Sequence, residues 1–277
     1  MKTEEAAINN KKGFLILAQN TPDTNYTRQA RVLARSIHQS QSEPIGVSVV
    51  VDEDIPKGED FDCVIKLSED DAKLEKWKIH NKWRMWELSP YEKTLWLDSD
   101  MVVPVDISWW WDELEGIPIR FCTRPVDFQG MAIRREVYRK VWVEHKLPMV
   151  YTGMVYFDRS FTAERMFKTA KVVFREWPTV SKEFGIINQD VTGDLAFSLA
   201  VEILRDYRAV PEVDDFFKFV LMKPKAFKMP NSISSNWADS LSLIVDGNIL
   251  IDGKIQKYPL HYVDKELVHI FEEHLRS

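Results

Sequence analysis

Two aspartates one residue apart, Asp98 and Asp100, are the side chains of this sequence best placed to do chemistry. They follow the apolar run 94–97 (TLWL), and an apolar run resumes at Met101. Buried strands avoid carboxylates unless these are paired or bind a cation. Because side chains at positions i and i+2 of an extended chain point to one side, the two carboxylates are expected to converge. We therefore expect them where a strand ends and a cleft begins.

An open pair of carboxylates suits magnesium or manganese and leaves coordination positions for water or for phosphate oxygens. A cation bound in this way would offset the charge of a diphosphate and stabilise it as a leaving group. The alternative interpretation is that both acids cap a turn or pair with nearby lysine or arginine, since the pattern D-x-D is common by chance.

The elements around the pair are predicted to be strands that alternate with helices. Short apolar runs closed by polar residues predict strands at 13–20, 44–54, 61–68, 91–100 and 149–157. Apolar residues at helical spacing predict helices at 26–40, 76–89, 163–177 and 194–207. This alternation indicates an α/β fold with a mostly parallel central sheet and helices on both faces. Ligands of such sheets bind at the carboxyl ends of the strands, where Asn20 and Asp98 fall.

The C-terminal part of the chain has a different texture. Two Asp-Gly pairs interrupt apolar runs between 241 and 263, which predicts a hairpin. No low-complexity linker and no internal repeat divides the sequence. We therefore expect a single domain over residues 1–277, with a C-terminal hairpin excursion.

Composition and charge exclude several classes of protein. The 277 residues are 45% apolar and 29% charged, which is typical of globular proteins. A formal net charge of −6 gives no broad attraction to nucleic acid or to anionic membranes. Cys63 and Cys122 lack the spacing of a metal site or a disulfide framework. With no secretory h-region and no apolar segment of membrane-spanning length, we expect a cytoplasmic protein without a membrane partner.

The ungapped block 82–103 (KWRMWELSPYEKTLWLDSDMVV) contains a lysine, a Pro-Tyr pair, a second lysine, an apolar strand and D-S-D. This block resembles the glycogenin-like, retaining nucleotide-sugar glycosyltransferases, which have the Rossmann-like A-type glycosyltransferase fold. The resemblance implies that Lys82 binds the substrate and that Asp98 and Asp100 bind the metal. It also places Ser99, between the two acids, among the residues that bind the donor.

Other segments resemble the same family less closely. Tyr26, at the start of NYTRQARVLARSI, matches a tyrosine that stacks on the nucleobase, although it could equally staple the start of a helix. Asn20, after the first strand, is placed with the donor-binding residues. His261 matches a third metal ligand, and Lys265 is the nearest match to a lysine that binds the diphosphate, at shorter spacing. An imidazole beside two carboxylates favours Mn²⁺ over Mg²⁺.

Two motifs depart from the family pattern on the side of the transferred sugar. Thr152 stands where asparagine is usual, and the pair Gly193-Asp194 is followed by leucine in place of glutamine. Asp194, Gln189 and Asp190 are the candidates to face the reacting sugar. Each of them could instead be a helix N-cap or a turn residue.

The expected reaction moves a sugar from a nucleotide diphosphate sugar, with UDP as the expected nucleotide, to an acceptor hydroxyl. Retention is implied by the resemblance alone. Lys82 and Lys265 would offset the charge of the diphosphate beside Mn²⁺ or Mg²⁺. In this interpretation residues 13–205 form the donor-binding core, and 211–277 form an acceptor-side excursion that returns to the metal site.

The acceptor is not defined by the sequence. A carbohydrate, a lipid or another small molecule is favoured, and a hydroxylated base in DNA is an alternative, because lysines and aromatic residues mix at 214–237. Acidic residues at 212–215 offset much of that positive charge.

Two other classes of protein share this alternating architecture. A sugar-phosphate nucleotidyltransferase would need a glycine-rich loop after the first strand, and 18–28 (AQNTPDTNYTR) has no glycine. A nonenzymatic nucleotide-sugar-binding module would have the same fold and bind the donor without turnover. Kinases and P-loop enzymes are excluded because neither of their phosphate-binding motifs occurs.

Overall fold

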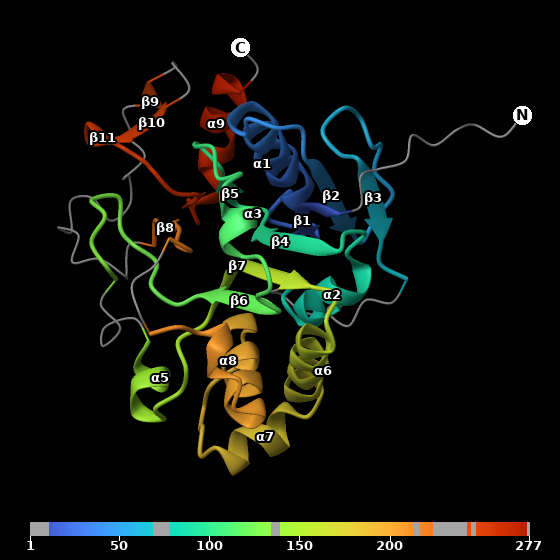
Figure 1. Ribbon diagram of the computed structural model, residues 1–277, viewed down its shortest axis with the longest axis vertical. Coiled ribbons are helices and arrows are strands. Elements are labelled where there is room, and N and C mark those ends of the chain that lie inside the picture. Colours follow the sequence, from blue (N-terminus) through green and yellow to red (C-terminus); the bar gives the residue numbers. More distant parts are fainter. Residues whose placement is uncertain are drawn as a thin grey trace, which may run out of the picture.

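A computed structural model describes residues 11–68, 78–133, 139–212, 216–223, 243–244 and 248–275. Its centre is a six-stranded sheet in the order β3-β2-β1-β4-β7-β6 (Figure 1). The strands are β1 Lys12–Ala18, β2 Gly46–Val51, β3 Cys63–Lys66, β4 Lys93–Asp98, β6 Ile119–Cys122 and β7 Tyr151–Asp158. Strands β1 to β4 are mutually parallel, and β7 runs antiparallel to both of its neighbours. The predicted mostly parallel α/β sheet is confirmed.

Helices cover both faces of the sheet, as predicted (Figure 1). On one face lie α1 Tyr26–Ser40 and α3 Trp110–Glu113, and α9 Val268–His274 packs against α1. On the other lie α2 Met85–Leu88, α6 Phe161–Arg175 and α8 Gly193–Leu204, with α7 Trp177–Glu183 beyond them. The short helix α5 Lys140–Glu144 lies beyond the edge strand β6.

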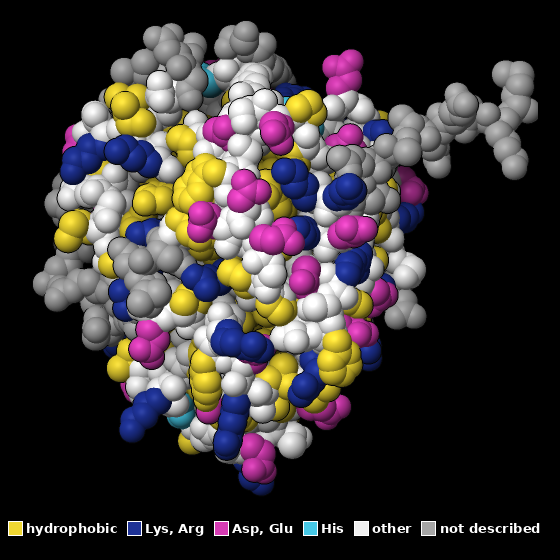
Figure 2. All heavy atoms as spheres, in the orientation of Figure 1, with side chains coloured by type: hydrophobic (Ala, Val, Ile, Leu, Met, Phe, Trp, Pro, Cys, Tyr) yellow, Lys and Arg dark blue, Asp and Glu magenta, His cyan; other side chains and the backbone are white. Residues whose placement is uncertain are grey.

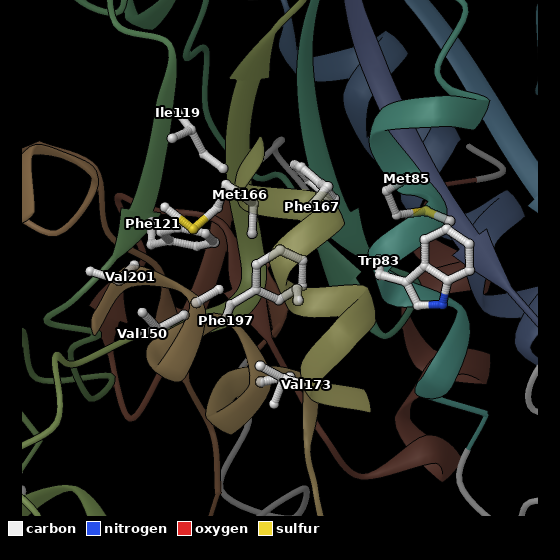
Figure 3. Packing of buried hydrophobic residues seen from close by; sticks show 14 of the residues in the cluster. Trp83, Met85, Ile119, Phe121, Val150, Met166, Phe167, Val173, Phe197 and Val201 are labelled. Carbon is white, nitrogen blue, oxygen red and sulfur yellow. The ribbon is translucent and has the colours of Figure 1, made fainter. Parts of the chain in front are cut away.

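The period-two pattern of the strands divides the core between the two faces. In β1, Phe14 and Ile16 pack beneath α1, whereas Leu15 and Leu17 face α6 and α8. Figure 3 shows the second of these layers, in which Phe167 and Phe197 from α6 and α8 meet with ring centroids 5.1 Å apart. Full burial of each such side chain stabilises the fold by about 1.5–3 kcal/mol. The edge of the sheet where β4 ends is thus fixed from both sides.

The predicted helix over 76–89 is shorter than expected in the part of it that the structure describes. A 3-10 helix, η1 His80–Arg84, leads directly into the single turn of α2. Polar contacts in the interior account for the difference, because Asn81 donates to Gln19 at 2.9 Å and Lys82 binds Asp98. Such tertiary contacts override intrinsic helix propensity.

The C-terminal segment forms two small sheets. One joins β5 Met101–Val102, β12 Leu260–His261 and β8 Val220–Leu221 in the order β5-β12-β8. The other joins β9 Leu243–Ile244, β10 Asn248–Ile251 and β11 Lys254–Ile255, which confirms the predicted hairpin. Asp252 and Gly253, at φ 50° and 71°, turn β10 into β11, as the positive φ values of a type I′ turn require. The other Asp-Gly pair lies outside the described residues.

The surface carries both signs of charge. Figure 2 shows acidic and basic side chains interspersed over the face in view, without a dominant patch of either sign. Cys63 and Cys122 are free thiols. Within the described ranges, no helix is both long enough and apolar enough to span a lipid bilayer.

Candidate active site

The D-x-D pair lies at the carboxyl end of β4. Asp98 is the last residue of that strand, and Ser99 and Asp100 form a turn before β5 begins. The two carboxylates converge, but the turn brings them together, not the one-sided geometry of an extended chain. One ligand atom from each of Asp98, Asp100 and His261 lies within 4.8 Å of the other two. These three side chains, named here the acid–histidine cluster, are a candidate metal centre.

Strand pairing brings His261 to the two aspartates. In β12, His261 lies opposite Met101 of β5, the residue that follows the D-x-D turn. The backbone N–H of Tyr262 donates to the carbonyl of Asp100 at 3.2 Å. The imidazole Nε2 then lies 2.9 Å from Oδ2 of Asp100, and its ring centroid is 5.8 Å from that of Phe219. A two-residue strand pair therefore fixes a contact across 161 positions of sequence.

The surroundings of the imidazole fit a metal ligand. The other ring nitrogen of His261, Nδ1, is buried and has no hydrogen-bond partner among the described residues. Gly153, in β7, lies beside it, and a Cβ there would be 3.2 Å from Nδ1 and 3.6 Å from Oδ2 of Asp98. The space beside Nδ1 of His261 and Oδ2 of Asp98 thus exists because residue 153 is a glycine. The set of two carboxylates and one imidazole suits Mn²⁺.

Two lysines neutralise the aspartates of the cluster. The ammonium of Lys82 lies 2.8 and 3.0 Å from the two oxygens of Asp98, and Lys265, in η6 (Lys265–Leu267), donates to Oδ2 of Asp100. Burial lowers the pKa of Lys82, but the charges of Asp98 and Asp194 outweigh it and raise this pKa overall. Burial raises the pKa of Asp100, but His261 and Lys265 bring it well below its usual value. Lys82 and Asp100 are therefore both charged at neutral pH.

Asp194 lies at the start of α8, close to Lys82. Its Oδ1 accepts hydrogen bonds from the backbone N–H and the hydroxyl of Thr152, both at 2.7 Å, and its Oδ2 accepts from Arg139 at 2.5 Å. Burial raises the pKa of Asp194, but the charges of Arg139 and Lys82 bring it down to about 2. A Cβ at position 193 would come within 2.8 Å of Lys82 and Thr152, so glycine permits this approach.

Arg139 is a site residue that the sequence did not reveal. It is only 4% exposed, and its guanidinium lies 3.8 Å from the ring centroid of Tyr151 and 4.5 Å from that of Trp142. This stacking and the ion pair with Asp194 fix both partners. Sequence alone offers no signal that separates Arg139 from its neighbours in RREVYRK, because only the fold brings it to α8.

Besides the two lysines, Tyr26, Asn20 and Ser99 are the residues expected to bind the donor. The ring centroid of Tyr26 lies 5.3 Å from the ammonium of Lys265, and burial raises the pKa of its hydroxyl. Asn20 accepts a hydrogen bond from the N–H of Thr27 at 3.0 Å and donates to Glu53, so it ties the loop after β1 to the start of α1. Ser99 is 3% exposed within the D-x-D turn. Within the described part of the chain, Tyr26 is thus the one of these three whose side chain contacts a lysine that binds the acid–histidine cluster.

Gln189 and Asp190 lie in the loop before α8. The carbonyl of Gln189 accepts a hydrogen bond from the indole N–H of Trp177 at 3.1 Å, and its side chain donates to the carbonyl of Asp190. Asp190 is exposed. Among the residues that the structure describes, neither side chain forms a hydrogen bond or ion pair with the acid–histidine cluster. Asp194 is therefore the candidate that the fold places beside the candidate metal centre, next to Lys82.

No protein-family model and no curated protein matches this sequence. Among solved structures, the bifunctional glycosyltransferase WbbM has a TM-score of 0.52 at 11% identity, over 97% of this chain and 50% of that one. Mouse xyloside xylosyltransferase 1 has a TM-score of 0.50 at 11% identity, over 91% and 97%. The galactosyltransferase LgtC has 0.48 at 15%, over 68% and 70%. The chain thus spans half the length of WbbM, and its fold is the A-type glycosyltransferase fold.

Proposed function

We propose that this protein is a metal-dependent glycosyltransferase that moves a sugar from a nucleotide diphosphate sugar to an acceptor hydroxyl, with retention. The observation that carries the proposal is the acid–histidine cluster at the carboxyl end of β4, flanked by Lys82 and Lys265. Ligands of open α/β sheets bind at this edge. The A-type glycosyltransferase fold agrees with this reaction.

Asp98, Asp100 and His261 would hold the metal, which is proposed to be Mn²⁺ or, with weaker support, Mg²⁺. When bound, the ion offsets the charge of the diphosphate and of the leaving nucleotide. Two observations support this assignment: the buried Nδ1 of His261 has no hydrogen-bond partner in the described part of the chain, and Gly153 leaves space beside it.

The charges of the site are balanced in a way that favours joint binding of cation and diphosphate. The three carboxylates of Asp98, Asp100 and Asp194 face the three cations of Lys82, Lys265 and Arg139. A divalent cation alone would add uncompensated positive charge beside two ammonium groups. A diphosphate alone would meet the carboxylates. Together they keep the site near neutrality, and the ammonium groups can then bind phosphate oxygens.

Tyr26 is proposed to stack on the nucleobase, with UDP as the proposed nucleotide. Tyr26 is the first residue of α1, and its ring lies next to Lys265. The Lys265 side chain in turn binds Asp100 of the acid–histidine cluster. Asn20 supports the loop that carries this helix start, and Ser99 belongs to the turn between the metal ligands. Their role in donor binding is thus proposed to be support of the binding surface.

Asp194 is proposed to stabilise the positive charge that develops on the sugar. With a pKa of about 2, the carboxylate is too weak a base to take a proton from a hydroxyl. Both of its oxygens already accept hydrogen bonds, which makes it a poor nucleophile. These features favour attack by the acceptor from the face that the leaving group vacates, with the hydroxyl proton passing to the departing diphosphate. Gln189 and Asp190 are proposed to lie farther out on the side of the site that faces the reacting sugar.

A carbohydrate or another small molecule is the proposed acceptor. The stretch 214–237 that suggested DNA lies mostly outside the described residues. Within the described part, Lys218 lies 5.7 Å from the ring centroid of Tyr258. The mixed charge on the face shown in Figure 2 gives DNA no specific support.

The test is release of nucleoside diphosphate from a panel of nucleotide sugars, with Mn²⁺, with Mg²⁺ or with chelator, in the absence of acceptor. Metal-dependent release from one donor would establish the reaction class and identify the sugar. Donor binding without release, with or without a panel of acceptors, would favour a nonenzymatic binding module. If the protein neither binds nor hydrolyses any donor of the panel, the proposal is contradicted.

A further inference from the structure

A cleft with a volume of about 550 Å³ lies beyond the edge strand β6. It is bounded by α5, by the loop from α5 into β7, and by the segment that begins with η2 (Tyr207–Ala209). Clefts of roughly 300–1,000 Å³ are the usual size for small-molecule sites. None of the roles proposed above uses this cleft.

Strand ends place this cleft at the same edge of the sheet as the acid–histidine cluster. Cys122, the last residue of β6, pairs with Tyr151, the first residue of β7. Because β7 is antiparallel to β4, its first residues lie at the edge where β4 ends. Thr123 and Met149, which flank this pair along the chain, both line the cleft. The cleft and the metal site therefore open along one edge.

One side chain separates the cleft from Asp194. Trp142 lines the cleft, and its ring centroid is 4.5 Å from the guanidinium carbon of Arg139. That guanidinium donates to Oδ2 of Asp194 at 2.5 Å. Along the chain, Met149 is three residues from Thr152, which also binds Asp194, and three residues span at most roughly 10 Å. A ligand held in the cleft could thus extend to the proposed position of the transferred sugar.

Among the described residues, the lining combines aromatic side chains with hydrogen-bonding groups whose charges sum to zero. Tyr207 is 49% exposed and Trp142 forms part of the wall. Thr123, Lys146 and Glu212 supply a hydroxyl, an ammonium and a carboxylate. One charge of each sign does not favour a phosphate or a nucleic acid. Aromatic rings that accept the apolar face of a ring, beside groups that bind hydroxyls, suit a neutral saccharide.

We infer that this cleft binds a neutral saccharide, which forms the non-reacting part of the acceptor. That the saccharide is an acceptor rests on the proposed glycosyltransferase function. That the cleft binds a saccharide does not depend on that function. Binding energy from this remote part of the substrate would hold the reacting hydroxyl near the donor sugar.

The experiment uses two variants of the full chain at residues that line the cleft. Val143→Trp fills it from a side chain that is 46% exposed, and Tyr207→Ala removes its exposed aromatic surface. Phe161→Ala, on α6 and outside the cleft lining, removes an aromatic side chain that is 70% exposed and is the matched control. The probe is an array of immobilised neutral oligosaccharides, and donor hydrolysis without acceptor is measured in parallel.

The wild-type protein and Phe161→Ala are expected to bind the same glycans with the same affinity. Both cleft variants are expected to bind those glycans at least about tenfold more weakly. Donor hydrolysis should be the same in all four proteins, since the cleft does not contact the donor. Equal glycan binding by all four, or no glycan binding by the wild type, would overturn the inference. Cleft-dependent glycan binding without any donor turnover, even when the retained glycans are supplied as acceptors, would leave the saccharide site standing and refute the transferase function instead.

Discussion

His261 and Asp100, 161 positions apart in the sequence, meet with Nε2 2.9 Å from Oδ2. The contact exists because β12 pairs with the strand that directly follows the D-x-D turn. The C-terminal segment therefore completes the candidate metal centre, which the core sheet alone does not contain. Any change that weakens the pairing of β12 with β5 should weaken the site as well.

The His261→Ala variant should bind Mn²⁺ much more weakly than the wild-type protein. Loss of an outer partner of a ligand commonly lowers metal affinity by roughly 10- to 100-fold, and loss of a ligand should do at least as much. His269→Ala, which removes an exposed histidine of α9, is the matched control. Titration with Mn²⁺ followed by electron paramagnetic resonance measures both. Unchanged affinity in His261→Ala would remove the imidazole from the metal site.

The Gly153→Ala variant tests the space beside the two ligand atoms. The added methyl would come within 3.2 Å of Nδ1 of His261 and 3.6 Å of Oδ2 of Asp98, so the imidazole must shift by a few tenths of an ångström. We expect weaker Mn²⁺ binding and a melting temperature close to that of the wild type, because alanine is tolerated in a strand. If Mn²⁺ affinity stays the same while the protein is destabilised, Gly153 serves packing and not the metal site.

Much of the fold was predictable because its signals are local. The apolar runs of β1 and β2 and the periodicity of α1 follow from neighbouring residues. The position of Asp98 and Asp100 at a strand end followed from the same run. The extent of the helix around Lys82 was not predictable, because contacts with distant strands determine it.

The site was predictable only in part. His261 was identified through a resemblance, since nothing local distinguishes it from a structural histidine. Arg139 gave no signal, because its role depends on stacking between Tyr151 and Trp142 and on the start of α8. Thr152 was seen as a departure from a motif, whereas in the structure its N–H and hydroxyl bind Asp194.

The Lys265→Ala variant should affect metal and nucleotide in opposite directions. Without its ammonium group, Asp100 loses a competing cation, so Mn²⁺ alone should bind more tightly. A nucleoside diphosphate should bind less tightly, since one positive charge at the phosphates is lost. Calorimetric titrations with Mn²⁺, and with UDP in the presence of Mn²⁺, measure the two affinities. Lys66→Ala, which removes an exposed lysine paired with Asp54, should leave both unchanged. A lower affinity for both Mn²⁺ and UDP in Lys265→Ala would contradict the idea that Lys265 competes with the metal for Asp100.

The Asp194→Asn variant should lower stability in a pH-dependent way. The folded pKa of Asp194, about 2, lies below the value of roughly 3.9 for an unfolded aspartate. Its ionisation therefore stabilises the fold fully above about pH 4, and this stabilisation is lost as the pH falls towards 2. Urea unfolding should show a large difference between variant and wild type at pH 7 and a smaller one at pH 3. Asp112→Asn, an exposed acid of α3, is the control. A difference independent of pH would assign the effect to lost packing.

The close approach of Tyr91 to β1 gives a prediction about stability alone. A Cβ at Gly13 would lie 2.4 Å from the ring of Tyr91, whose hydroxyl is 2.7 Å from that of Ser48. Overpacking of this kind costs about 1–3 kcal/mol, so Gly13→Ala should lower the free energy of unfolding by that amount.

The double variant Gly13→Ala, Tyr91→Ala separates this clash from a general effect of the glycine. Removal of the ring leaves a cavity beside β1, into which the new methyl can extend without strain. Gly13→Ala should therefore cause little or no further loss in the Tyr91→Ala background, and the two substitutions should be strongly non-additive. Urea unfolding of the four proteins measures the coupling. Additive losses would mean that Gly13 is required for the backbone of β1 itself, and not to make room for Tyr91.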